Sequence, residues 1–271
     1  MNRKLVIALC WVFVVACFGR DPQAARFEEL THRIKAVNSE ATGARMAAVG
    51  RMFLGVPYEP NTLEVNDEEQ LVVRFDGFDC FTFAESVLAL AHAPESYENY
   101  RALLQRLRYR DGRIEGYASR LHYTTDWARE NAEQGMVEDV TAALGGEPYD
   151  KTIDFMSKHR KSYQALKTDD QALSQIEAVE TELNRHKRTY LPKARLDAAA
   201  SGIVEGDILA ITTSIAGLDV VHVGLAVFVE GRLHMLHASS KNKKVEITKE
   251  PLSAYLAGHR TQTGVMVFRP K

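Results

Sequence analysis

The segment from Cys80 to His92 constrains the fold of this chain most strongly, because it reads as a helix that is apolar on nearly every side. Asp79 stands directly before it, where an N-cap residue belongs. A helix without a polar face needs cover on all sides, so the segment predicts the central helix of a packed domain. The composition allows such a core, since 45% of the 271 residues are hydrophobic and 26% are charged.

Two later segments predict a β-hairpin. Leu218 to Val229 alternates as a strand does. Every second residue from Val221 to Val229 lies on a core face, and the residues between them, starting with His222, lie on a more open face. Glu230-Gly231 is a plausible two-residue turn, and Arg232 to Ser239 reads as the returning strand.

The register of this hairpin decides which side chains meet. If Glu230 and Gly231 make the whole turn, Val229 pairs with Arg232, and His237 lies opposite Gly224. His237 then becomes a same-face diagonal neighbour of His222, whereas His234 points the other way. A loop longer by one residue would break this register.

Cys80, His222 and His237 together predict thiol chemistry. The amides and the dipole at a helix start favour a thiolate at Cys80 and can hold an oxyanion. His222 would act as the base, and His237 would orient it. The alternatives are a buried, inert cysteine and histidines that serve only the structure.

Charge and residue spacing bear on partners and cofactors. The formal net charge is −2 and the pI is near 6.5, and no long basic stripe occurs, so we expect no nucleic-acid partner. Cys80, His222 and His237 could also form a zinc site, but no clustered CxxC or HxxxH spacing supports one. We therefore expect a site that uses no metal and no cofactor.

The N-terminus predicts export. Two basic residues precede an apolar run from Leu5 to Phe18, which is the pattern of a signal peptide over residues 1–20. Val14 to Cys17 also resembles a lipoprotein signal, which is cleaved before Cys17 and lipidated there; ordinary cleavage shortly after Cys17 is the alternative. We expect a periplasmic or cell-envelope protein, with membrane anchoring in the lipidated case.

Several ordered motifs resemble those of the NlpC-type cell-wall cysteine hydrolases. They are Gly55-Val56-Pro57-Tyr58, Phe78-Asp79-Cys80-Phe81-Thr82-Phe83, His222-Val223-Gly224-Leu225 and Leu236-His237-Ala238-Ser239. The resemblance is narrowed to the bacterial branch described as N-acetylmuramoyl-L-alanine amidase-like by three further segments: Ser119 to Trp127, Leu191-Pro192 and Gly206 to Leu209. The similar region runs from about Ala41 to Phe268.

The resemblance implies an α+β, circularly permuted papain-like fold, in which a central antiparallel sheet packs against a nucleophile-bearing helix. It implies Cys80 as nucleophile, His222 as general base and His237 as the third polar residue. Tyr58 matches an aromatic position beside the nucleophile that helps to define the substrate groove. Phe81 departs from the many relatives that carry a small polar residue there, so any hydroxyl contribution at this position is lost.

The stretch before a predicted helix near Trp127 supplies candidate substrate-binding residues. Arg120 and His122 could bind a sugar or a stem peptide. The alternative is structural, with Thr125 or Asp126 capping the helix and Trp127 in the core.

The rest of the chain indicates one domain. Tyr97 to His186 is largely helical and charge-rich, and we interpret about 97–200 as an insertion within a single domain that covers 26–271. The resemblance implies hydrolysis of an amide bond in peptidoglycan or muropeptides through a thioester. The bond is that between N-acetylmuramic acid and L-alanine, or one between a D- and an L-residue of the stem peptide. The same residues would also suit an acyltransferase that uses this cysteine, or a binding lipoprotein without catalytic activity.

Overall fold

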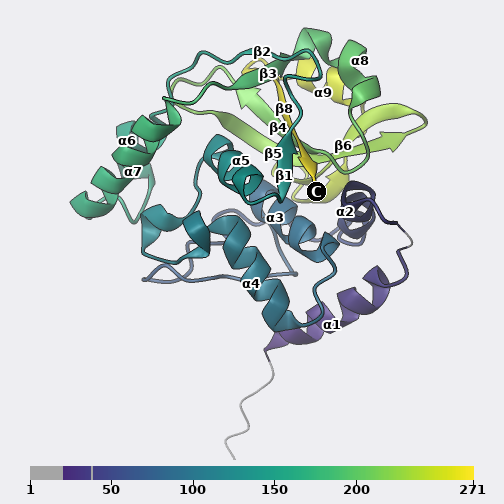
Figure 1. Ribbon diagram of the computed structural model, residues 1–271, viewed down its shortest axis with the longest axis horizontal. Coiled ribbons are helices and arrows are strands. Elements are labelled where there is room, and N and C mark those ends of the chain that lie inside the picture. The colour runs from purple at the N-terminus through teal and green to yellow at the C-terminus, as the bar shows by residue number, and fades with distance from the viewer. Residues whose placement is uncertain (1–20, 38) are drawn as a thin grey trace, which may run out of the picture.

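The computed structural model describes residues 21–37 and 39–271, so the expected signal peptide and Cys17 lie outside the described residues. Helix α3 (Cys80–Ala91) runs through the middle of the molecule (Figure 1), and every residue from Thr82 to Ala91 is buried. Asp79 caps it through a capping box with Thr82. The central helix predicted by the sequence is therefore confirmed.

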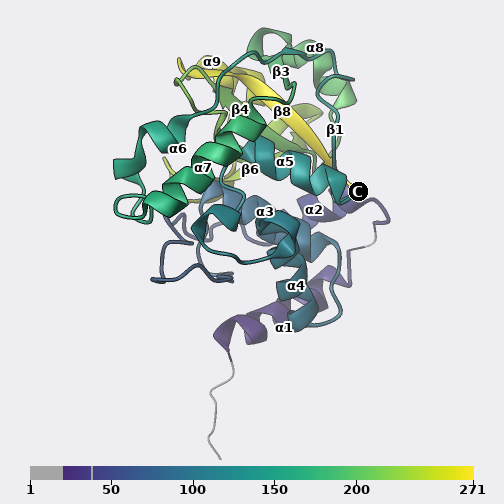
Figure 2. The same ribbon diagram turned by 60° about the vertical axis from the view of Figure 1, so that its left-hand side comes forward.

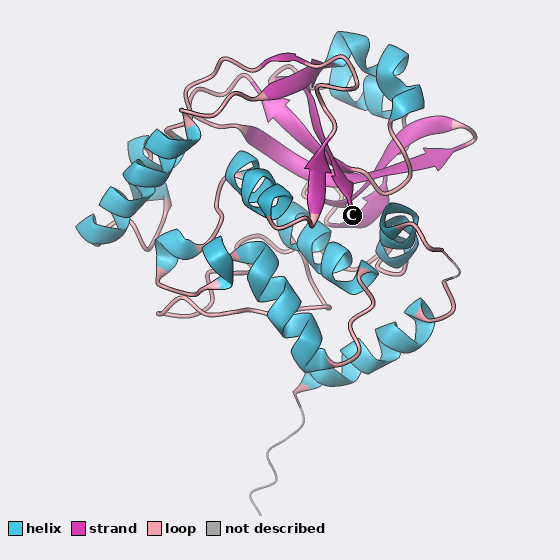
Figure 3. Ribbon diagram, viewed as in Figure 1, coloured by secondary structure: helices cyan, strands magenta, loops and turns pink. Residues whose placement is uncertain are grey.

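A twisted antiparallel sheet forms the other half of the molecule. Its strands follow the order β2-β3-β8-β4-β5-β6-β7, and β1 also pairs with β8. The strands are β1 (Val137–Asp139), β2 (Glu147–Pro148), β3 (Thr189–Pro192), β4 (Ile208–Thr213), β5 (Val220–Val229), β6 (Arg232–Ser239), β7 (Lys244–Ile247) and β8 (Gln262–Pro270). Most of the helices lie together on one side of the sheet, and short helices lie beyond its other side (Figure 3), which suits an α+β protein.

Both faces of the sheet are covered. Helices α2 (Thr42–Arg51) and α3 pack on one face, where Val223, Leu225 and Val227 join their core. Helices α8 (Leu196–Ala199) and α9 (Leu252–Ala257) cover the other face, where Ala226 is completely buried. The expectation of a more open second face is therefore wrong over most of β5, because a second apolar core fills that side.

The β5–β6 hairpin has the expected register. Val229 pairs with Arg232, and the pairing continues to Leu225 opposite Leu236. Glu230 and Gly231 both have positive φ, 50° and 75°, as a tight two-residue turn demands. This turn fixes the pairing that places His222 and His237 on the same side of the hairpin.

The start of β5 differs from the expected alternation. The pairing with β4 slips by one residue, so that Ile211 faces His222 while Thr212 faces Val220. Val221 is the extra residue of this β-bulge and is 37% exposed, whereas Val220 is buried in its place. The assignment of Val221 to the core face is wrong, because a bulge breaks the two-residue period.

The interval 97–200 contains helices and also part of the sheet. Its longer helices are α4 (Tyr97–Arg108), α5 (Thr124–Glu133) and α7 (Asp170–Leu183), with the short α6 (Phe155–Lys158) beside α7 (Figure 2). Strands β1, β2 and β3 of the same interval join the edge of the sheet. Helix α1 (Pro22–Ile34) packs against α3 and α4. Within 21–37 and 39–271, no helix is long and apolar enough to cross a membrane.

Candidate active site

Cys80 occupies the first position of α3, as the sequence predicts, and it is the free cysteine of the described region. Backbone N–H groups of Val223, Cys80 and Phe81 are directed toward its sulfur. Val223 follows His222 in the chain, so this contact brings the start of α3 against the part of β5 that carries the candidate base.

The electrostatic setting of Cys80 differs from the expectation of a stabilised thiolate. Burial and the neighbouring Asp79 carboxylate together raise the pKa of the Cys80 thiol to about 12, and the three amides offset this only in part. The Asp79 carboxylate also accepts hydrogen bonds from the amides of Phe81 and Thr82, at 3.0 and 2.8 Å. The thiol is therefore neutral at rest, and the Cys80 amide is the helix-start N–H that Asp79 does not hold.

His222 and His237 meet as the hairpin register predicts. The Nε2 atom of His222 lies 2.6 Å from Nδ1 of His237, and the two rings are nearly perpendicular. One nitrogen donates and the other accepts, so each ring fixes the tautomer of the other. With Nε2 of His222 engaged by His237, Nδ1 is the nitrogen of His222 that stays open to a reacting group.

Both imidazoles are held neutral. Burial, followed by the nearby His237 and His259, lowers the pKa of His222 to about 3. Burial lowers the pKa of His237 to about 4, with a small opposing effect of Glu246, which pairs with it across β6 and β7. The site therefore combines a protonated thiol with two neutral histidines near pH 7.

His222 and His237 open into a polar cavity of about 650 Å³. Its other lining side chains include Ser239, Glu246 and Tyr255. The Tyr255 ring lies edge-on to His237 at 6.0 Å, and burial, followed by the charge of Glu246, raises the pKa of Tyr255. His222, His237 and Tyr255 therefore line one cavity, and the Val223 amide, next to His222 in sequence, links this part of β5 to Cys80.

Tyr58 forms a β-bridge with Phe78, two residues before Cys80 in the sequence. Its side chain is half-buried, and burial, then the charges of Cys80 and Asp79, raise its pKa. The Lys243 ammonium lies 5.5 Å from the centre of its ring. Tyr58 therefore stays a candidate for the aromatic side chain that the resemblance places beside the nucleophile.

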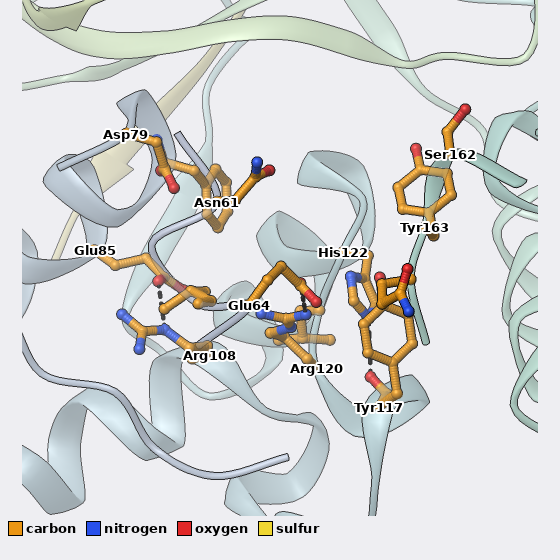
Figure 4. Close-up of a pocket in the computed structure, with 14 residues that line it drawn as sticks. Asn61, Glu64, Asp79, Glu85, Arg108, Tyr117, Arg120, His122, Ser162 and Tyr163 are labelled. Atoms are coloured by element: carbon orange, nitrogen blue, oxygen red, sulfur yellow. Dashed lines mark hydrogen bonds and ion pairs between the residues drawn. The ribbon is translucent and has the colours of Figure 1, made fainter. Parts of the chain in front are cut away.

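Arg120 and His122 line a second cavity, of about 480 Å³, which Figure 4 shows. Asp79 and Phe81, the residues on either side of Cys80 in sequence, line its near end. Nε2 of His122 donates to the Tyr117 carbonyl, 2.8 Å away, and burial lowers the pKa of His122 to about 3. The two candidate binding residues thus share one cavity next to Cys80.

For the residues that follow, the structural alternative is correct for Trp127 and wrong for the helix cap. Trp127 is 2% exposed and packs edge-on against Phe81 at 5.6 Å. This contact explains why a large ring occupies the position of Phe81. Neither Thr125 nor Asp126 caps α5, whose N-cap is Tyr123 without a side-chain hydrogen bond. Thr125 instead donates to Asp219, which precedes β5.

Sequence reasoning missed several residues of the site. Thr62 donates to the Asp79 carboxylate at 2.8 Å, Glu64 forms an ion pair with Arg120, and Tyr255 faces His237. All three come from segments distant in sequence, and no local periodicity marks them. Among the described residues, no group of three or more His, Cys, Asp or Glu side chains is arranged to hold a metal ion.

One family model matches most of the chain, and two crystal structures are about 40% identical to it. The family model of N-acetylmuramoyl-L-alanine amidase-like proteins matches residues 48–264. A crystal structure of an N-acetylmuramoyl-L-alanine amidase from Bacteroides uniformis is 40% identical, with a TM-score of 0.83 over 85% of this chain and 99% of that one. A second crystal structure is of a Bacteroides fragilis protein that is provisionally described as a xylanase. It is 42% identical, with a TM-score of 0.78 over 81% of this chain and 98% of that one.

A more distant structure shows the same fold. A Legionella pneumophila protein is 22% identical, with a TM-score of 0.66 over 91% of this chain and 96% of that one. No curated protein matches the chain.

Proposed function

The chain belongs to the N-acetylmuramoyl-L-alanine amidase-like family, and on this basis we propose that it is a cysteine-dependent hydrolase of amide bonds in bacterial peptidoglycan or muropeptides. The proposed bond joins N-acetylmuramic acid to L-alanine, following the relative from Bacteroides uniformis. The observation that carries the cysteine mechanism is the 2.6 Å contact of His222 with His237, next to the Val223 amide that faces Cys80.

The proposed resting state is a neutral thiol–imidazole pair. For His222 to accept the thiol proton on Nδ1, its Nε2 carries a hydrogen and donates it to Nδ1 of His237. His237 then carries its own hydrogen on Nε2. This single arrangement of tautomers makes His222 a base and His237 its positioning residue.

The reaction proceeds by proton transfer during attack. The Cys80 sulfur bonds to the substrate carbonyl carbon while its proton moves to Nδ1 of His222, and the Cys80 amide donates to the developing oxyanion. The C–N bond then breaks, the amine leaves with the proton from His222, and a thioester remains. A water molecule attacks the thioester by the reverse proton path, which releases the acid and restores the thiol.

Tyr58, Arg120 and His122 are the proposed substrate contacts. Tyr58 borders the sulfur, and Arg120 and His122 lie in the cavity that begins at Asp79 and Phe81. The family's likeness to the NlpC-type enzymes leads us to propose a circularly permuted papain-like arrangement for this fold. We also propose export by the N-terminal signal, and a lipid anchor at Cys17, which intact mass of the protein from a bacterial membrane fraction would test.

Defined muropeptides, incubated with the protein and with its Cys80→Ser variant, test the function. We expect release of a free stem peptide that begins with L-alanine, only with the unmodified protein, as read by mass spectrometry. Shorter peptide fragments would show that the protein cleaves a bond inside the stem peptide instead of the proposed bond. Equal turnover by Cys80→Ser would overturn the cysteine mechanism.

A further inference from the structure

Arg120 has a carboxylate bound to it inside the cavity where substrate is proposed to lie. Figure 4 shows Arg120 in the middle of the lining, with Glu64 bonded to it, between Asp79 on one side and Tyr117 on the other. The Arg120 side chain is only 5% exposed. A cation so deeply buried needs an anionic partner. One of its two carboxylate partners, Glu64, lines the cavity itself.

The two carboxylates that face Arg120 are held very differently. Glu69 is 8% exposed, lies 3.6 Å from Nε of Arg120 and accepts a 2.7 Å hydrogen bond from the Tyr109 hydroxyl. The Glu64 side chain is 37% exposed, and within the described ranges Arg120 is its one side-chain partner. Glu69 is a fixed counter-ion, whereas Glu64 can leave toward water.

The chain around Glu64 permits this movement. Residues 59–77 form neither helix nor strand. Thr62 anchors the segment to Asp79, and the Glu64 amide closes a turn onto the Asn61 carbonyl at 3.0 Å. Rotation of the Glu64 side chain alone therefore frees the guanidinium, without displacement of the loop.

The other arginine of this cavity offers no comparable position. The Nε atom of Arg108 donates to Glu85 at 2.8 Å, Nη1 donates to the Val72 carbonyl, and both side chains of the ion pair are at most 3% exposed. Removing Glu85 from Arg108 would leave a charge buried without a partner. The cavity therefore has one exchangeable cationic position, at Arg120.

We propose that Glu64 is a built-in placeholder for a carboxylate of the substrate, which displaces it and forms the same ion pair with Arg120. This inference rests on the proposed function, since it assumes that the substrate lies in this cavity. A carboxylate matches the planar guanidinium in two parallel hydrogen bonds, as the Glu64 group it replaces can. A neutral amide offers one acceptor oxygen and no charge. The geometry thus selects substrates with a free carboxylate over amidated ones.

Binding to a Cys80→Ala background tests this apart from catalysis. The probes are two stem-peptide muropeptides that differ only in whether their carboxylates are free or amidated. In that background, Glu64→Gln removes the competing charge and should tighten binding of the free-carboxylate probe about fivefold, which is about 1 kcal/mol. The affinity for the amidated probe should change by less than about twofold, which is the effect expected from loss of a distant surface charge.

Glu68→Gln is the matched control, because it removes one negative charge from the same loop at an exposed position. It should leave both affinities within about twofold. Arg120→Gln should abolish the preference for the free carboxylate, and Arg120→Lys, which keeps the charge, should retain part of it. Circular dichroism would establish that each variant folds.

Equal tightening by Glu64→Gln and Glu68→Gln, or equal tightening of both probes, would overturn the proposal. Binding that follows the expected pattern, in a protein whose cysteine form shows no turnover, would retain the placeholder and reject the proposed reaction. Turnover of muropeptides by the cysteine form, without any effect of Glu64→Gln on binding, would retain the proposed reaction and reject the placeholder.

Discussion

The cavity on the hairpin side, lined by His222 and His237, and the cavity on the loop side, lined by Arg120 and His122, are built by opposite means. On the hairpin side, His222 and His237 are neutral and are brought together by the register of two adjacent strands. On the loop side, the lining is charged, and Arg120 reaches Glu64 across 56 residues of sequence. Proton transfer gains from neutral, tightly placed groups, whereas recognition of a polar ligand gains from charges that can exchange partners. The proposed proton transfer and the proposed recognition of the substrate are thus assigned to two different cavities.

The largest expected effect is a loss of activity that distinguishes His222 from His234, whose side chains point to different sides of the hairpin. His222→Ala should lower kcat/KM by about 1,000-fold or more, because it removes the base. His234→Ala is the matched control, since His234 also lies on the hairpin but bonds to the Thr248 carbonyl at 2.8 Å. Its kcat should stay within about threefold of the parent value. If both variants fold and lose comparable activity, the assignment of His222 as the base would be contradicted.

On the loop side, the largest effect should be on stability. Arg108→Met leaves Glu85 buried without its cation and should lower the free energy of unfolding by about 3–5 kcal/mol. The double variant Arg108→Met/Glu85→Met should recover most of this loss, because no unpaired charge remains. Urea denaturation measures both. A single-variant loss below about 1 kcal/mol would show that Glu85 is accommodated as a protonated acid.

His237→Ala should be a milder change on the hairpin side. It removes the group that orients His222 but leaves the base and the nucleophile, so kcat should fall about 10- to 100-fold, with little change in KM. His237→Asn offers an oxygen near the place of Nδ1 and should restore part of kcat. Failure of Asn to exceed Ala would show that the His222–His237 contact does not act through its hydrogen bond.

The hairpin turn should affect stability without affecting the site. Gly231 has a φ of 75°, and a Cβ atom added there would meet open space, so Gly231→Ala should cost about 1 kcal/mol through backbone strain alone. We expect kcat to be unchanged because the strand register is also fixed by the pairing of β5 with β4. A large loss of kcat would mean that this turn, rather than the sheet, holds the histidines.

The smallest effect concerns pH. The pKa of His222 is lowered to about 3, so its imidazole stays neutral and able to accept a proton as the pH falls through 6.5. We expect kcat/KM to change by less than about twofold between pH 7 and pH 5, in buffers of equal ionic strength. An acidic limb near pH 6.5 would instead indicate that His222 titrates as an exposed imidazole does.

The hairpin side was predictable from sequence because its geometry is local. Periodicity and a two-residue turn were enough to bring His222 next to His237, and an apolar run with Asp79 before it was enough to begin a helix at Cys80. The β-bulge at Val221 was not predictable, because no residue type in this segment indicates an extra residue in the strand. The sequence also favours a thiolate at Cys80, and this prediction differs from the structure. Burial and the nearby Asp79 carboxylate raise the pKa of the thiol, and both effects depend on the folded chain.

The loop side was much less predictable. Arg120 and His122 were identified as binding candidates, but the carboxylates that face Arg120 were not, because ion pairs between distant segments leave no periodic signal. The strands β1, β2 and β3 were missed for a related reason. They contain two to four residues each, too few to show alternation, and they are strands through pairing with β8 and with one another.

The cap of helix α3 has a consequence for the durability of the protein. Peroxides and most alkylating reagents attack a thiolate far faster than a thiol. Burial and the Asp79 carboxylate, which Thr62 and Thr82 hold in place, together raise the pKa of the Cys80 thiol and so keep the sulfur in its less reactive form. The residue that caps the helix thereby also contributes, with burial, to slower oxidation of the sulfur between turnovers.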